Sequence, residues 1–188
     1  MKHARSHTVA RPTSTLVGVA ALVLALAAAG SARALTLAAM PLEEMTRAAS
    51  VVVRARCIDR QVTRSASGRI ESIARFEVLE EAKGEGDRVV TVRQLGGRLD
   101  ADGTELVVPG APLSEPGDEA LLFLEPHDGE VMTVVGLALG YMPVAVLPGS
   151  GPVVRVSRVL GAEYASGGVR PVGEILRRVR DLDRLGRR

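Results

Sequence analysis

The chain has 188 residues, of which 24 are Lys or Arg, 22 are Asp or Glu and only four are aromatic. Four of the basic residues and none of the acidic ones lie in residues 1–34, so residues 35–188 carry 20 basic and 22 acidic side chains. This weakly acidic body argues against nucleic-acid binding, which calls for a basic face. The scarcity of aromatic side chains argues against a surface on which carbohydrate rings or the bases of single-stranded nucleic acid would stack.

The first 34 residues have the three parts of a secretory signal peptide. Lys2, Arg5 and Arg11 precede a wholly apolar run at 16–29, and Ala32-Arg33-Ala34 is a small-x-small cleavage site. We therefore expect cleavage near Ala34 and export of residues 35–188 to the periplasm or the medium.

A membrane anchor is the alternative interpretation of this segment. A spanning helix needs about 20 apolar residues, and the run at 16–29 is shorter and rich in Ala. A lipoprotein is disfavoured because Cys57 is the only cysteine and lies far beyond the apolar run.

Residues 35–188 are enough for one domain with its own core, and no linker or repeat divides them. The single cysteine excludes an intramolecular disulfide, on which many small exported domains depend. Cys57 shares an alternating face with Val51, Val53 and Ala55, which predicts a buried strand cysteine that acts as a small hydrophobe. An intermolecular disulfide or a reactive thiol is the alternative.

The pattern predicts a short amphipathic helix at 41–49 and then a β core over about 51–159. Val51–Val62 and Arg69–Glu81 alternate and flank the turn Ser65–Gly68, which predicts a hairpin. In the second strand Ile70, Ala74, Phe76 and Val78 are expected to face inward, and Glu71, Arg75 and Glu77 outward. The further strands are expected at 88–94, 119–125, 131–139, 142–147 and 152–159, and the loop that ends at 105–108 can form a short ribbon.

Two of these segments carry additional expectations. Glu119–Glu125 is so rich in Leu and Phe that we expect a central strand buried on both faces. Pro126-His127-Asp128-Gly129 has the composition of a turn.

The chain is expected to end in an amphipathic helix at about 171–186. Val172, Ile175 and Val179 recur at helical spacing, and the opposite face carries Arg177, Arg178, Arg180 and Arg184. We expect this helix to pack on the domain. The alternative is a basic surface for a membrane or a partner, although Asp181 and Asp183 interrupt it.

The fold class predicted from these elements is mostly β. Many short strands with frequent turns indicate a small antiparallel, OB-like barrel or a sandwich, with a short N-terminal helix and an amphipathic C-terminal helix.

The residues needed for catalysis or metal binding are scarce. Residues 35–188 contain one histidine, His127, and one cysteine, Cys57, which cannot assemble a His/Cys zinc site within one chain. A Cys–His nucleophile pair would require these two to meet, and no G-x-S-x-G elbow is present. The sequence therefore predicts no enzyme, no catalytic or metal residues and no cofactor.

The one local carboxylate cluster is Asp100, Asp102 and Glu105. The segment has some features of a calcium loop but lacks its third acidic position and distal Glu. We interpret it as a tight turn. An enzyme with an unfamiliar site built from these three carboxylates is an alternative function.

Several segments between residues 50 and 146 resemble a family of uncharacterised exported bacterial proteins. They are ASVVVRARC, RFEVLEEAKGEGDRVVTVRQLGG, GAPLSEPGDEALLFL and VVGLALGYMPV. The order of elements is also similar, more distantly, to the OB-like module of netrins and metalloproteinase inhibitors. The resemblance implies a small barrel and no known activity, and Leu35 at the expected mature start rules out inhibition through an N-terminal cysteine.

The function expected from the sequence is that of an exported, non-catalytic binding or accessory module. Its partner would be another exported or envelope protein, and the long loop Gly96–Pro116 would supply the binding surface. The alternative is an envelope-associated structural protein that docks through its basic C-terminal helix.

Overall fold

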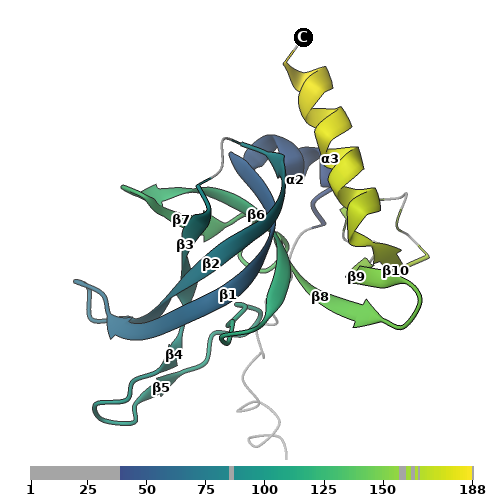
Figure 1. The fold of residues 1–188 in the computed structure, drawn as a ribbon. Helices are drawn as coiled ribbons and strands as arrows, with labels where there is room; N and C mark the ends of the chain where they lie inside the picture. Colours follow the sequence, from purple (N-terminus) through teal and green to yellow (C-terminus); the bar gives the residue numbers. More distant parts are fainter. Residues whose placement is uncertain (1–38, 85–86, 157–159, 162–163, 165, 188) are drawn as a thin grey trace, which may run out of the picture. The chain divides into compact units, whose positions relative to one another are not determined.

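A computed structural model describes residues 39–187 except 85–86, 157–159, 162–163 and 165 (Figure 1). Residues 37–188 form one compact unit, and the expected signal peptide at 1–34 lies outside the described residues. The elements in chain order are α2 (Leu42–Ala48), β1 (Val51–Arg64), β2 (Ile70–Lys83), β3 (Val89–Leu95), β4 (Gly97–Arg98), β5 (Glu105–Leu106), β6 (Glu119–Asp128), β7 (Val131–Val134), β8 (Tyr141–Leu147), β9 (Gly151–Val156), β10 (Gly168–Pro171) and α3 (Val172–Gly186).

The prediction of a mostly β domain with a helix at each end of the folded part is confirmed. Eight strands form one sheet in the order β1-β2-β3-β7-β6-β8-β9-β10, and β1 also pairs with β6. All the pairings are antiparallel except that of β3 with β7. Strands β4 and β5 make a separate two-stranded ribbon.

The predicted hairpin is formed by the two longest strands, β1 and β2. They pair from Val52↔Lys83 to Arg64↔Ile70 around the turn at 65–69, with three register shifts. Ala74 and Phe76 are fully buried, as their alternation predicted, while Arg75 and Glu77 are exposed.

Strand β6 is buried on both faces and separates two clusters of core side chains. Leu121 and Phe123 point to the helix-side cluster, which also holds Leu42 and Met45 of α2 and Ile175 of α3. Alternate residues of β6 point the other way, into a sheet-side cluster that is shared with β1, β2, β3 and β7. The prediction of a central strand is therefore confirmed.

Helices α2 and α3 lie side by side over the helix-side cluster (Figure 1). In α3 the buried residues are Val172, Ile175, Leu176 and Val179, at the spacing that the sequence predicted. The predicted packing of this face on the domain is confirmed, because these four side chains are at most 1 % exposed.

The strands around residues 126–140 differ from the expectation. Strand β6 continues through Pro126 and His127 to Asp128, so the expected turn begins only at Gly129. Pairing with β1 ends at Leu124, and proline is tolerated where a strand becomes an edge. A register irregularity against β7 marks the same place.

Strand β7 ends at Val134 instead of Leu139. Gly136 and Leu137 both have positive φ, at 62° and 64°, which breaks the strand. The turn at 135–140 then folds onto β6, where the Phe123 N–H donates to the Gly140 carbonyl at 2.8 Å and the Val135 N–H donates to the Phe123 carbonyl at 3.0 Å. The turn conformation at Gly136 and Leu137 thus ends the strand, although the apolar run indicated a longer one.

The last part of the sheet contains an element that the sequence did not predict. Strand β10 pairs antiparallel with β9, from Gly168↔Val156 to Pro171↔Val153, and leads directly into α3. Strand β9 ends at Val156, and the expected continuation to 159 lies outside the described residues.

Among the described residues, no helix is long and apolar enough to cross a membrane.

Candidate functional site

Cys57 lies inside the sheet-side cluster, on the face that its alternation predicted. It is 1 % exposed and packs with Val53 and Ala55. Burial raises the pKa of its thiol, although the nearby Asp59 carbonyl, 3.5 Å from Sγ, lowers it in part. A buried thiol with a raised pKa is a poor nucleophile.

His127 lies far from Cys57 and is exposed at the opposite end of β6. The Cys57 N–H donates to the Asp118 carbonyl, just before β6 begins, and His127 follows about nine residues later. At about 3.3 Å per residue, a strand of that length spans roughly 30 Å. The structure therefore does not bring the two together.

Asp100 and Asp102 lie between β4 and β5, Glu105 begins β5, and all three are exposed. The Asp102 carboxylate accepts a hydrogen bond from the Thr104 N–H at 2.9 Å and pairs with Arg64 at 3.2 Å. Hydrogen bonds from Thr104, supported by Arg64, lower the pKa of Asp102. Asp102 thus shapes a tight turn, and within the described residues no three His, Cys, Asp or Glu side chains could hold a metal ion.

A buried polar network holds the C-terminal end of the loop 96–116. Ser114 is fully buried, and its N–H donates to Gln94 Oε1 at 3.1 Å. Gln94 Nε2 donates back to Ser114 Oγ at 2.9 Å, and Ser114 Oγ donates to the Tyr141 hydroxyl at 3.0 Å. Burial raises the pKa of Tyr141, although the Ser114 hydrogen bond lowers it in part. The three side chains therefore fix the loop to β3 and β8.

The N-terminal end of the loop, at Gly96 and Gly97, is also held by close contacts. Ser72 Oγ donates to the Gly96 carbonyl at 2.7 Å. Gly97, at φ +130°, lies so close that an added Cβ would be 2.6 Å from Ser72 Oγ and 2.9 Å from Val62. Between the two ends, Val107 projects with 69 % of its surface exposed. The loop is thus a preorganised projection.

An apolar groove of about 520 Å³ lies on the part of the sheet built from β8, β9 and β10. The pairs Ala145↔Val153 and Arg155↔Val169 belong to the groove face. The opposite face carries Val154 and is covered by the helix-side cluster. The groove is lined by Ala138, Leu139, Tyr141, Met142, Pro143, Ala145, Leu147, Val153, Arg155, Leu160 and Val169.

The groove adjoins the anchored loop through Tyr141. This side chain lines the groove, while its hydroxyl accepts the hydrogen bond of Ser114 at the end of the loop. The sequence analysis missed the groove because it predicted the strands without showing which face the C-terminal helix would cover. The available signal was apolar residues at both alternating sets of positions in 141–147.

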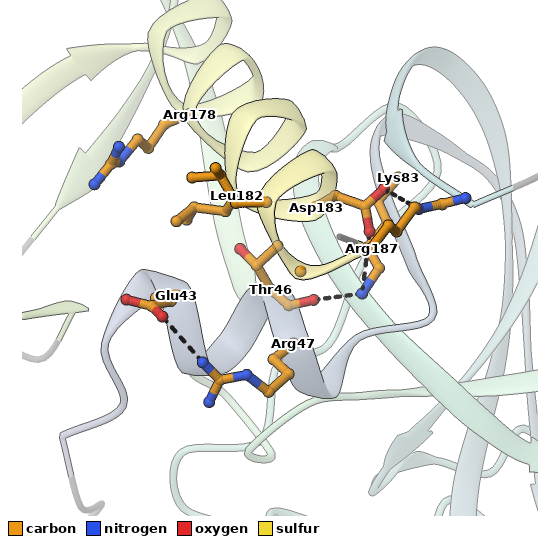
Figure 2. A pocket seen from close by; sticks show the side chains of 10 residues that line it. Glu43, Thr46, Arg47, Lys83, Arg178, Leu182, Asp183 and Arg187 are labelled. Atoms are coloured by element: carbon orange, nitrogen blue, oxygen red, sulfur yellow. Dashed lines mark hydrogen bonds and ion pairs between the residues drawn. The ribbon is translucent and has the colours of Figure 1, made fainter.

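A second pocket, of about 680 Å³, lies between α2 and the end of α3 (Figure 2). Leu182 faces α2, and Arg47 and Arg187 are paired with Glu43 and Asp183 at 3.0 and 2.9 Å. Lys83 Nζ donates to the carbonyls of Thr46 and Ala49 at 2.7 and 2.6 Å. The two arginine pairs are thus internal to α2 and to α3, while Lys83 ties β2 to α2 and lies 3.8 Å from Asp183 of α3.

The basic face of α3 is also partly used within the fold. Arg180 donates to Glu80 Oε1 at 2.9 Å and to the Glu81 carbonyl at 2.8 Å, which ties α3 to β2. Arg177, Arg178 and Arg184 remain exposed, and Leu185 beside them is 64 % exposed.

Searches with the whole chain found no matching family model and no matching curated protein.

Proposed function

We propose that the chain is an exported, non-catalytic binding module whose binding surface is the loop 96–116 and the groove beside it. The anchoring of this loop through Ser114 carries the proposal, because ordering a loop before binding reduces the entropy lost in the complex. The signal-like segment at 1–34 supports export.

An OB-like barrel is the scaffold that we propose for this surface. Its support is that β1 pairs with β2 on one side and with β6 on the other, so the pairings β1-β2-β3-β7-β6 return to β1. Five strands joined in this way match the size of an OB-type barrel.

The absence of catalysis is part of the same proposal. It is supported by the burial of Cys57, by the separation of His127 from it and by the structural use of Asp102. A nucleophile needs a base within hydrogen-bond reach.

Docking to the envelope through α3 is the alternative function. Its support is the exposed Leu185 with the neighbouring Arg184, an apolar and basic combination that suits an anionic membrane surface.

Site-specific photocrosslinking in cells that express the full chain distinguishes the two functions. Val107 and Leu185 are 69 % and 64 % exposed, which makes them a matched pair for a photoreactive amino acid. The binding module predicts a discrete protein adduct from position 107 and none from position 185. Adducts from position 185 alone, with lipid or envelope protein, would establish the docking alternative and contradict the proposal.

A further inference from the structure

The groove on β8, β9 and β10 has the properties of a peptide site. Its volume of about 520 Å³ lies in the range of ligand sites. Leu147 and Val169 leave 42 % and 41 % of their surface exposed within it, while Val153 at its floor is 4 % exposed. An apolar floor with half-exposed walls gains free energy when an apolar segment covers it.

Among the described residues that line the groove, Arg155 is the only charged one. It is exposed, and it forms no ion pair with any of the described residues. A second copy of the chain packed face to face would bring two such guanidinium groups toward each other. Charge complementarity instead favours a partner that carries a carboxylate.

Strand β10 ends the strand order of the sheet, so only its edge toward β9 pairs with a described strand. An extended peptide can pair with such an edge and place alternate side chains over the groove. Arg155 lies opposite Val169 of β10, so its Cα is about two strand spacings, roughly 10 Å, from an added strand. The combined reach of an Arg and a Glu side chain spans that distance.

We propose that the groove binds an extended segment of another protein, in which apolar side chains alternate around one carboxylate that pairs with Arg155. The pairing with β10 is short, because Pro171 has no N–H, so the groove side chains must supply most of the affinity. This inference rests on the proposed binding function and names the class of partner.

Selection of peptides from a random phage-displayed library tests the proposal without a known ligand. The bait is protein recovered from cells that express the full chain, as wild type, Arg155→Glu and Ala145→Trp. Arg184→Glu is the matched control, since Arg184 is an exposed arginine on α3, away from the groove. Thermal melting verifies that each variant is folded.

The expected result is enrichment of alternating apolar peptides with one Asp or Glu. Arg155→Glu should weaken binding of these peptides about tenfold and should select Lys or Arg at the acidic position, while Arg184→Glu changes neither. Ala145→Trp, which fills the groove, should abolish enrichment.

Three results would overturn the proposal. They are no enrichment, enriched peptides that bind Arg155→Glu and wild type equally, and a concentration-dependent dimer in sedimentation that Ala145→Trp dissociates. Because crosslinking at Val107 tests the loop independently of the groove, failure of this inference and failure of the binding function are distinguishable.

Discussion

Single residues fix the places where the chain must turn sharply or where charges gather between strands. Gly97 is one, because both its positive φ and its close neighbours exclude a side chain. Glu119 is another, because it joins the start of β6 to two arginines of β1, Arg54 at 2.8 Å and Arg56 at 2.6 Å.

Gly97→Ala is expected to lower the free energy of unfolding more than Gly117→Ala. Both glycines have positive φ, at 130° and 100°, but an added Cβ meets Ser72 and Val62 only at Gly97. The backbone conformation alone costs about 1–2 kcal/mol, and the overpacking at Gly97 adds about 1–3 kcal/mol. Urea denaturation of the two variants measures the difference, and equal losses would contradict the packing at the base of the loop.

Glu119→Gln is expected to lower the free energy of unfolding at neutral pH by about 1–2 kcal/mol. Burial opposes ionisation of Glu119, but the hydrogen bonds and charges of Arg54 and Arg56 together lower its pKa below the usual 4.5. A lowered pKa in the folded state means that this stabilisation is present above pH 4.5 and is lost as the pH falls through the folded value. Urea denaturation of wild type and variant from pH 7 to pH 3 should therefore show the difference shrinking in acid. A difference that stays constant in acid would show that the charge of Glu119 is not its cause.

At the scale of elements, the two faces of α3 have different roles. One face is part of the helix-side cluster, and Arg180 adds polar contacts to β2. Residues 184–187 at the end of the helix are exposed. The apolar face of the helix is thus a packing surface, while Arg177, Arg178 and the last turn stay exposed to solvent.

Ile175→Ala and Leu185→Ala test this division within one helix. Ile175 is fully buried, so its truncation should lower the free energy of unfolding by about 2–4 kcal/mol. Leu185 is 64 % exposed, and its truncation should change stability by less than about 0.5 kcal/mol. The midpoints of urea unfolding give both values. Similar small effects would mean that α3 does not pack on the sheet in solution.

At the scale of the whole molecule, two core clusters share β6 as their common wall. The sheet-side cluster encloses Cys57 among strands that are far apart in sequence, β1 and β6. Access to this thiol therefore reports on opening of the whole domain rather than of one loop.

Cys57 is expected to resist thiol reagents in the native protein and to react fully in denaturant. It is 1 % exposed, and burial raises the pKa of its thiol above the usual 9.0, so both access and thiolate content are low. Reaction with a chromogenic aromatic disulfide at pH 8 measures the contrast between the native protein and protein unfolded in about 6 M guanidinium. Stoichiometric reaction of the native protein within seconds would contradict the burial.

The sequence alone predicts the local elements, because periodicity is a property of neighbouring residues. It predicted both helices, the long hairpin, the doubly buried strand at 119–125 and the burial of Cys57 beside Val53 and Ala55. It did not predict the end of β7, where positive φ at Gly136 and Leu137 interrupts an apolar run. It also did not predict β10, because a strand of four residues has too little pattern of its own.

Long-range packing sets which surfaces of the domain remain open. The alternation of Val153, Val154 and Arg155 shows two faces, but burial of Val154 in the helix-side cluster is what leaves Val153 and Arg155 in a groove. Gln94, Ser114 and Tyr141 are likewise ordinary polar residues in the sequence, 20 and 27 positions apart. Their network exists because strand pairing brings β3 and β8 to the same end of the loop. A binding surface of this kind depends on long-range contacts, which no local pattern encodes.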